Sequence, residues 1–190
     1  MRVKDEIKQE AIIKATVALV NEIGFASSSV SKIAKRANVS PATIYIYFEN
    51  KEDLLVSTYI KIKSCLADAL MGNFDTSLPI RDTLLKAGNN LFKYIIAQPD
   101  MFYFTEQFAN SPFNNDKVKT QVEAAYLPMI DLLQFGMDQK IIKNVPLELL
   151  LAHLFYPIFN LANPRINPHF QASQQNVELA LSMAWDAIKR

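Results

Sequence analysis

The stretch SVSKIAKRANVSPATIYIYFENKEDLL, residues 29–55, decides how the N-terminal part of this chain folds. Its first apolar positions recur every three or four residues, which predicts a short helix over residues 30–37. Asn38 follows, a residue type that tolerates a left-handed turn. Ser40 and Pro41 then provide an N-cap and a first helical position for a second short helix that begins at Pro41. Because so few residues separate them, the two helices are predicted to form a helix-turn-helix.

The second of these helices has a surface of small and hydroxyl-bearing side chains, among them Ala42, Thr43 and Tyr45. Such side chains can present hydroxyls to base edges in a DNA major groove and rest apolar atoms on thymine methyls. The pattern therefore predicts a helix that contacts DNA.

Residues 7–55 resemble the TetR family of bacterial transcriptional repressors. The resemblance is carried by these elements: Gly24-Phe25, Ser29-Val30, Ile33-Ala34, Val39-Ser40, TIYIYF at 43–48 and NKEDL at 50–54. Two positions depart from the family pattern, since Pro41 replaces a residue that is often basic or small and polar, and Ile46 replaces one that is often polar or histidine. Both departures remove possible hydrogen bonds to DNA, so the operator sequence stays open.

The resemblance implies an all-α fold of about nine helices, with a DNA-binding domain over residues 1–50 and an effector-binding and dimerisation domain over residues 51–190. It also implies that Thr43 and Tyr45 contact bases and that Tyr47 and Lys51 contact phosphates. The predicted DNA-contacting residues are Ser29, Lys32, Ser40, Pro41, Ala42, Thr43, Tyr45, Ile46, Tyr47 and Lys51. Alternatives remain for several of them, because a serine can be only a cap, a lysine can simply face water and a tyrosine can pack on the first helix.

The distribution of charge agrees with DNA binding only weakly. The net charge is +1, but residues 1–63 hold ten Lys and Arg against seven Asp and Glu, whereas residues 64–190 hold ten against twelve. The basic excess therefore lies in the part that carries the helix-turn-helix. Because it is modest, we expect useful DNA affinity to need a dimer that combines two heads.

The composition argues against several other classes of protein. A single cysteine, Cys65, excludes an intramolecular disulfide and favours a cytoplasmic setting. The first ten residues alternate in charge where a secretory signal needs an apolar core, and no apolar run reaches the ~20 residues that span a bilayer. With two histidines and no glycine-rich phosphate loop, the sequence predicts no enzyme, no cofactor and no metal site.

The rest of the chain has helical periodicity, punctuated by prolines. Residues 7–24 are predicted to form the first helix, ended by Gly24, and a long helix is predicted from Asn50 to near Gly72 and Asn73. Further helices are predicted over residues 79–98, 100–110, 114–139 (kinked at Pro128), 146–162 and 171–189.

Residues 101–108 are dense in aromatic side chains and could line an apolar cavity for a small-molecule effector. The alternative for any one of these residues is an ordinary aromatic core. Glu106, Glu123 and His153 are the candidate polar contacts. The predicted effector-binding residues are Tyr94, Phe102, Phe104, Glu106, Phe108, Glu123, Tyr126, Met129, His153, Phe155 and Phe159.

The last two predicted helices are the expected dimer surface, because the resemblance places a four-helix bundle there. The predicted interface residues are Leu151, Leu154, Phe155, Ile158, Val177, Leu181, Ala184 and Ile188. The sequence thus predicts a ligand-responsive homodimeric regulator, a repressor that binds a palindromic operator and is released by a small apolar or aromatic effector. The alternative is a helical small-molecule binding protein of the same fold without DNA function, which Pro41 and Ile46 leave open.

Overall fold

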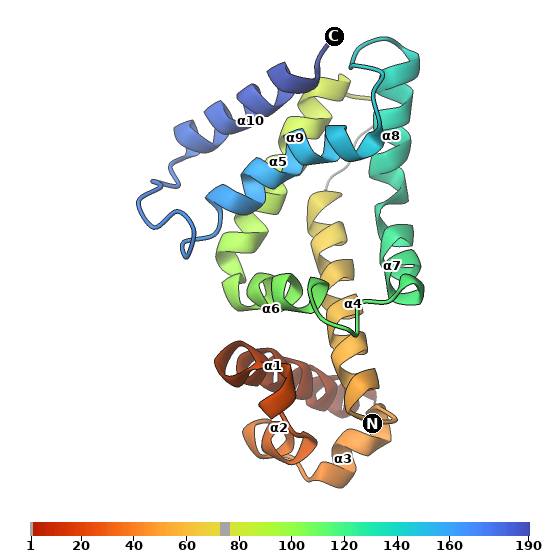
Figure 1. The fold of residues 1–190 in the computed structure, drawn as a ribbon, viewed down its shortest axis with the longest axis vertical. Helices are drawn as coiled ribbons and strands as arrows, with labels where there is room; N and C mark the ends of the chain where they lie inside the picture. Colours follow the sequence, from red (N-terminus) through yellow and green to blue (C-terminus); the bar gives the residue numbers. More distant parts are fainter. Residues whose placement is uncertain (1, 73–76) are drawn as a thin grey trace. The chain divides into compact units, whose positions relative to one another are not determined.

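The computed structural model describes residues 2–72 and 77–190, without the side chains of residues 2–4, and this part of the chain is all-α, as predicted (Figure 1). Its helices are α1 (Arg2–Ser27), α2 (Val30–Arg36), α3 (Pro41–Tyr47), α4 (Lys51–Leu70), α5 (Ile80–Ala97), α6 (Pro99–Ala109), α7 (Asp116–Glu123), the 3₁₀ turn η1 (Ala124–Tyr126), α8 (Leu127–Asp138), α9 (Leu147–Leu161) and α10 (Gln174–Ile188). In this described part, none of the helices combines the length and the apolar character needed to cross a membrane.

One predicted helix is divided in the structure. The sequence suggested a single kinked helix over residues 114–139, but α7 and α8 are separate and η1 joins them. Pro128 lies at the second position of α8, where its missing N–H does no harm, so the proline opens a new helix and does not bend an old one. The predicted end of the fourth helix at Asn73 lies outside the described residues.

The chain forms two compact units, and each is described here by itself. Unit 1 comprises Met1–Lys63 and Asp100–Val122, and unit 2 comprises Ser64–Pro99 and Glu123–Arg190. These bounds differ from the predicted boundary after residue 50, because most of α4 up to Lys63, α6 and most of α7 pack with the N-terminal helices. Helix α4 contributes residues to both units.

The first core cluster of unit 1 supports the helix-turn-helix. Ile12 and Leu19 of α1 pack with Ile33 of α2, Ile44 of α3 and Leu54 of α4, and all five are buried. Burying side chains of this kind stabilises a fold by roughly 1.5–3 kcal/mol each. The cluster therefore holds α2 and α3 firmly against α1.

The second core cluster of unit 1 is rich in aromatic side chains and includes residues of α6. Tyr59 stacks on Phe108 with ring centroids 4.1 Å apart, and the edge of Phe25 meets Phe104 at 5.7 Å and Phe113 at 5.8 Å. Phe104 and Phe108 are both fully buried. Edge-to-face and offset-stacked pairs of this kind stabilise by roughly 0.5–1.5 kcal/mol beyond their burial.

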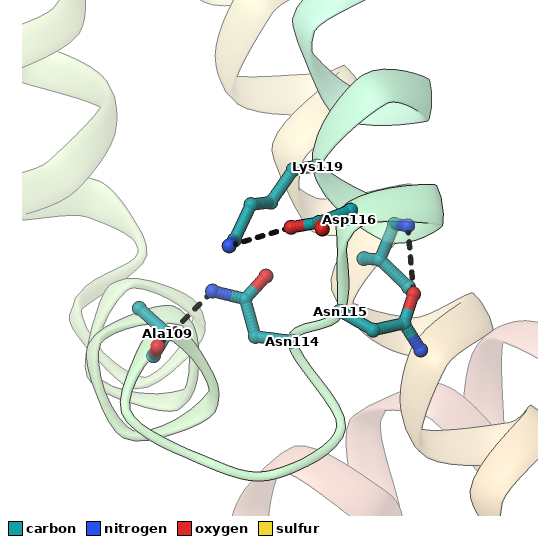
Figure 2. Close-up of polar contacts among 6 residues, drawn as sticks. Ala109, Asn114, Asn115, Asp116 and Lys119 are labelled. Atoms are coloured by element: carbon teal, nitrogen blue, oxygen red, sulfur yellow. Dashed lines mark hydrogen bonds and ion pairs between the residues drawn. The ribbon is translucent and has the colours of Figure 1, made fainter.

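The connection between α6 and α7 is fixed by its own polar side chains (Figure 2). Asn114 donates through Nδ2 to the carbonyl of Ala109 at 3.0 Å, and Asn115 Oδ1 accepts from the backbone N–H of Val118 at 3.1 Å. Lys119 and Asp116 form an ion pair at 3.1 Å on the exposed side. These contacts cap α7 and place Val118 in the aromatic cluster.

Unit 2 is built on the packing of α5, α9 and α10, which lie side by side (Figure 1). Helices α5 and α10 approach closely at Gly88, where an added Cβ would lie 2.4 Å from Cδ2 of the buried Leu181. The C-terminal end is tied to the loop before α9, since Lys143 N–H donates to the Ile188 carbonyl at 2.8 Å and Arg190 N–H to the Ile141 carbonyl at 3.1 Å. Even an alanine at position 88 would therefore require the Leu181 side chain to shift.

Candidate nucleic-acid interface

The turn between α2 and α3 has the geometry that the sequence predicted. Ser29 caps α2, and its side chain accepts from the backbone N–H of Lys32 at 3.3 Å. Asn38 adopts the left-handed conformation, with φ of 55°. Ser40 caps α3 by accepting from the N–H of Thr43 at 3.1 Å, and Pro41 occupies the first turn. These local predictions are confirmed.

Helix α3 presents one face to solvent and one to the core. Ile44 and the following Phe48 are buried in the first cluster, which fixes the rotation of the helix. The exposed residues are Ser40, Pro41, Ala42, Tyr45 and Ile46, whereas Thr43 and Tyr47 are half-buried. All seven belong to the set predicted to contact DNA, and that contact itself stays a prediction.

Two lysines of the predicted set are engaged with the end of α1. Gly24 has φ of 76° and breaks the helix, so the carbonyls that follow lack intrahelical partners. Lys51 Nζ donates to the carbonyls of Phe25 at 2.7 Å and Ala26 at 3.4 Å, and Lys32 Nζ donates to that of Ser27 at 3.0 Å. In this arrangement both ammonium groups stabilise the last turn of α1. The predicted phosphate contacts therefore have a second, structural role that the sequence pattern did not suggest.

Tyr47 has a partner that sequence reasoning missed. Its hydroxyl donates to Oδ1 of Asp5 at 3.2 Å, across 42 positions of sequence. Desolvation, and then the Asp5 carboxylate, raise the pKa of Tyr47 above its ordinary value. An ion pair between Arg36 and Glu22 similarly ties α2 to α1. No local pattern could signal either contact, because each joins helices that meet only after folding.

The predicted effector-binding residues are divided between the two units. Four of them, Phe102, Phe104, Glu106 and Phe108, belong to unit 1, where Phe104 and Phe108 fill the aromatic core. The other seven belong to unit 2: Tyr94, Glu123, Tyr126, Met129, His153, Phe155 and Phe159. The three predicted polar contacts, Glu106, Glu123 and His153, are all exposed to solvent. Of the two alternatives for Phe104 and Phe108, a cavity lining or an ordinary aromatic core, the structure shows the core.

Most of the predicted dimer residues face the interior of unit 2 and not solvent. All but the half-buried Leu151 are buried inside the single chain: Leu154, Phe155, Ile158, Val177, Leu181, Ala184 and Ile188. They form the stripes by which α9 and α10 pack within unit 2. Helical spacing marks an apolar stripe, but it does not say whether the stripe meets its own chain or a second copy. The prediction of these residues as an exposed interface is therefore corrected.

The opposite side of α9 and α10 is the one that remains open. Leu149 and Tyr156 of α9 and Leu179 and Met183 of α10 are exposed by 50%, 66%, 60% and 64%. A groove of about 730 Å³ runs between the two helices, and its lining includes Tyr156, Leu179, Met183 and His153. His153 lies here, with Nδ1 2.8 Å from the Leu149 carbonyl. Exposed apolar surface on this scale indicates a site of association.

Comparison with known proteins agrees with this architecture. Residues 12–58 match the family model described as bacterial regulatory proteins, tetR family, and residues 84–189 match the tetracyclin repressor-like C-terminal domain. The crystal structure of a TetR family transcription regulator from Marinobacter aquaeolei VT8 is 34% identical, with a TM-score of 0.95 over 100% of both chains.

Two relatives from Bacillus subtilis match in different ways. The fatty acid metabolism regulator protein is 52% identical over 52 residues, which is 27% of each chain. The structure of the transcriptional regulator FadR in complex with stearoyl-CoA is 23% identical, with a TM-score of 0.76 over 94% of this chain and 98% of that one, and at this identity it shows the fold alone.

Some of the matches to curated relatives cover only part of each chain. An uncharacterized HTH-type transcriptional regulator from Haemophilus influenzae is 30% identical over 110 residues, 58% of this chain and 59% of the relative. Both domain models, however, match in the order that the fold requires, and the second alone covers more than half of the chain. The chain therefore belongs to the TetR family of bacterial regulatory proteins.

Proposed function

We propose that this protein is a transcriptional repressor that binds an inverted-repeat DNA operator as a homodimer and releases it when a small molecule binds. The observation that carries the proposal is the helix-turn-helix of α2 and α3, which presents an exposed face of α3 that the chain itself leaves uncovered. Family membership supports it. Such a protein would act in the cytoplasm, where the bacterial chromosome lies.

The proposed dimer uses the open side of α9 and α10. Leu149, Tyr156, Leu179 and Met183 lose water contact only if another surface covers them. A two-fold symmetric interface brings the same patch from each copy together, so each apolar residue contributes twice. One recognition helix covers too few base pairs for useful affinity, whereas two helices held by one interface reach successive major grooves about 34 Å or a multiple apart.

Selection of bound sequences from random double-stranded DNA tests the DNA function. We expect an inverted repeat, bound by two copies of the chain, and a much weaker complex with DNA that carries one half-site. Failure to enrich any sequence, with a correctly folded and dimeric protein, would favour the alternative of a helical small-molecule binding protein without DNA function.

Control by a small apolar or aromatic molecule is a separate part of the proposal. Helix α4 begins beside the helix-turn-helix at Lys51 and contributes residues to both units, so a ligand in unit 2 could act on it. The relative crystallised with stearoyl-CoA suggests long-chain acyl-CoA as a first probe, beside aromatic compounds. The match to the fatty acid metabolism regulator spans 52 residues, 27% of each chain, so it does not carry the effector of that protein over to this one.

Thermal stabilisation by stearoyl-CoA and by a set of aromatic compounds would identify ligands. Each one should then be titrated with and without operator DNA. A regulatory ligand has a coupling free energy of ~1–3 kcal/mol, so operator DNA should weaken its binding about 5–150-fold. Ligands whose affinity ignores the operator would contradict effector control and leave DNA binding intact.

A further inference from the structure

Helix α3 lacks the side chains that usually identify bases by paired hydrogen bonds. Its seven residues are PATIYIY, with no Arg, Lys, Asn or Gln among them. Bidentate contacts of Arg or Lys to guanine, and of Asn or Gln to adenine, are therefore absent from this helix. Base recognition by α3 must rest on other contacts.

Most hydroxyls of α3 and its cap already have partners within the protein. Ser40 Oγ accepts from the N–H of Thr43, and the two hydroxyl oxygens lie 2.9 Å apart. The Tyr47 hydroxyl donates to Asp5. Tyr45, which is 55% exposed, carries the remaining hydroxyl of the helix. Few side-chain hydroxyls of α3 therefore remain available to form hydrogen bonds with base edges.

Apolar atoms, by contrast, are concentrated on the outward face. Ile46 is 76% exposed, the highest value among the large apolar side chains of the described residues. Ala42 lies four positions before Ile46, and Pro41 lies four before Tyr45, so these pairs form two neighbouring rows on the exposed side of the helix. An aliphatic side chain in this position gains free energy only when another apolar group covers it.

We propose that Ile46, flanked by Ala42, recognises the 5-methyl group of a thymine in each operator half-site. The thymine methyl is the one apolar group that a base pair of unmodified DNA presents in the major groove, and it distinguishes A·T from G·C and T·A from A·T. The inference rests on the proposed DNA function and names how α3 selects its site. Each operator half-site should accordingly contain a thymine at the base pair that the Ile46 side chain contacts.

The test removes methyl groups one at a time. Starting from the selected operator, deoxyuridine replaces thymidine at each position, symmetrically in both half-sites, and the affinity of the full-length dimer is measured at fixed salt. Loss of one buried methyl corresponds to ~0.8 kcal/mol, about fourfold, so a symmetric pair should weaken binding about 15-fold at the position that Ile46 contacts. Tolerated thymidines elsewhere serve as internal controls.

The variant Ile46→Ala assigns the effect to the residue. The Ile46 side chain is exposed, so the fold should be kept. In this variant, deoxyuridine at the contacted operator position should no longer weaken binding, so the ratio of affinities with thymidine and with deoxyuridine should be about one there and unchanged at other positions. Ile7→Ala is the matched control, since Ile7 is also exposed, by 61%, but lies on α1. It should leave every ratio unchanged.

Two outcomes would overturn the inference while the proposed function stands. One is an operator on which every deoxyuridine substitution changes affinity by less than about 1.5-fold. The other is a methyl effect that persists in Ile46→Ala, since the methyl would then contact a different residue. Failure of the wild-type protein to select any sequence would overturn the proposed function and this inference with it.

Discussion

The apolar surface of α3 and that of α9 and α10 both leave large apolar side chains in water, and they differ in extent. On α3, a helix of seven residues, the apolar face is limited to Pro41, Ala42, Tyr45 and Ile46. On α9 and α10 it extends along two helices and encloses a groove of about 730 Å³. A small face suits a groove of DNA that offers scattered methyl groups, whereas a long one suits a second copy of the same face. Exposure alone therefore does not distinguish the two proposed partners, whereas the difference in extent supports the proposal of DNA for one surface and of a second copy for the other.

The largest effect is expected from Met183→Asp, which tests the long surface. Met183 is 64% exposed on α10 and would occur twice in a two-fold interface. Two buried, mutually repelling carboxylates should cost ~4 kcal/mol together, which weakens the dimer about 1,000-fold. Analytical ultracentrifugation across a concentration series measures this, and operator binding should fall in parallel.

Asp at position 131, native and exposed on α8, shows that a carboxylate by itself is tolerated in unit 2. A Met183→Asp protein that still sediments as a dimer would move the interface away from α9 and α10. A Met183→Leu control should keep the dimer, because it preserves the apolar surface.

The next effect concerns the buried side of the same helix. Leu181 is 4% exposed and packs against Gly88, whereas Leu179 is 60% exposed. Leu181→Ala should lower the free energy of unfolding by about 3 kcal/mol through lost burial and a residual cavity. Leu179→Ala should change it by less than about 0.5 kcal/mol when both are made in the Met183→Asp background, where dimerisation does not contribute. Chemical denaturation measures both, and equal losses would contradict the assignment of sides.

Lys51→Met should produce a smaller change, and its pattern separates two roles. Loss of the bonds to the Phe25 and Ala26 carbonyls should destabilise unit 1 by about 1–2 kcal/mol. If Lys51 instead contacts phosphate, the dependence of log affinity on log salt should flatten by about one unit per chain, with stability unchanged. Lys35→Met, at an exposed position of α2, is the matched control. Loss of stability together with an unchanged salt slope would remove Lys51 from the DNA contacts.

The smallest effect should be a change in the pH dependence of stability in alkaline solution. One buried tyrosine in each unit contributes to it. Burial raises the pKa of Tyr59 in unit 1, and burial, with Cys65 and Asp68, raises that of Tyr94 in unit 2. An unfolded tyrosine loses its proton first, near pH 10, so the stabilisation is complete below that pH and is lost as the pH rises through the folded-state value. Melting temperatures between pH 8 and 11 should fall less steeply in Tyr59→Phe and in Tyr94→Phe than in wild type. A profile identical to wild type in both variants would contradict the burial of these hydroxyls.

The sequence by itself determined the local structure of the helix-turn-helix. Ser29, Asn38, Ser40 and Pro41 act through bonds and conformations that span at most four residues, so their types and spacing suffice to predict caps and turn. The all-α class was equally readable, because helical periodicity is a local property of the chain.

Only the tertiary structure decided which residues meet across the chain. Asp5 and Tyr47, or Lys51 and Phe25, lie too far apart in sequence for any pattern to join them. The same limit explains why the sequence did not show whether Phe104 and Phe108 line a cavity or fill a core. In the structure, Phe25 packs against Phe104 and Tyr59 stacks on Phe108, so both residues belong to a core. It also explains the dimer surface: α9 and α10 are apolar on two sides, and only their packing within unit 2 shows which side is used internally. Periodicity gives each helix an apolar stripe, but the choice of partner belongs to the folded chain.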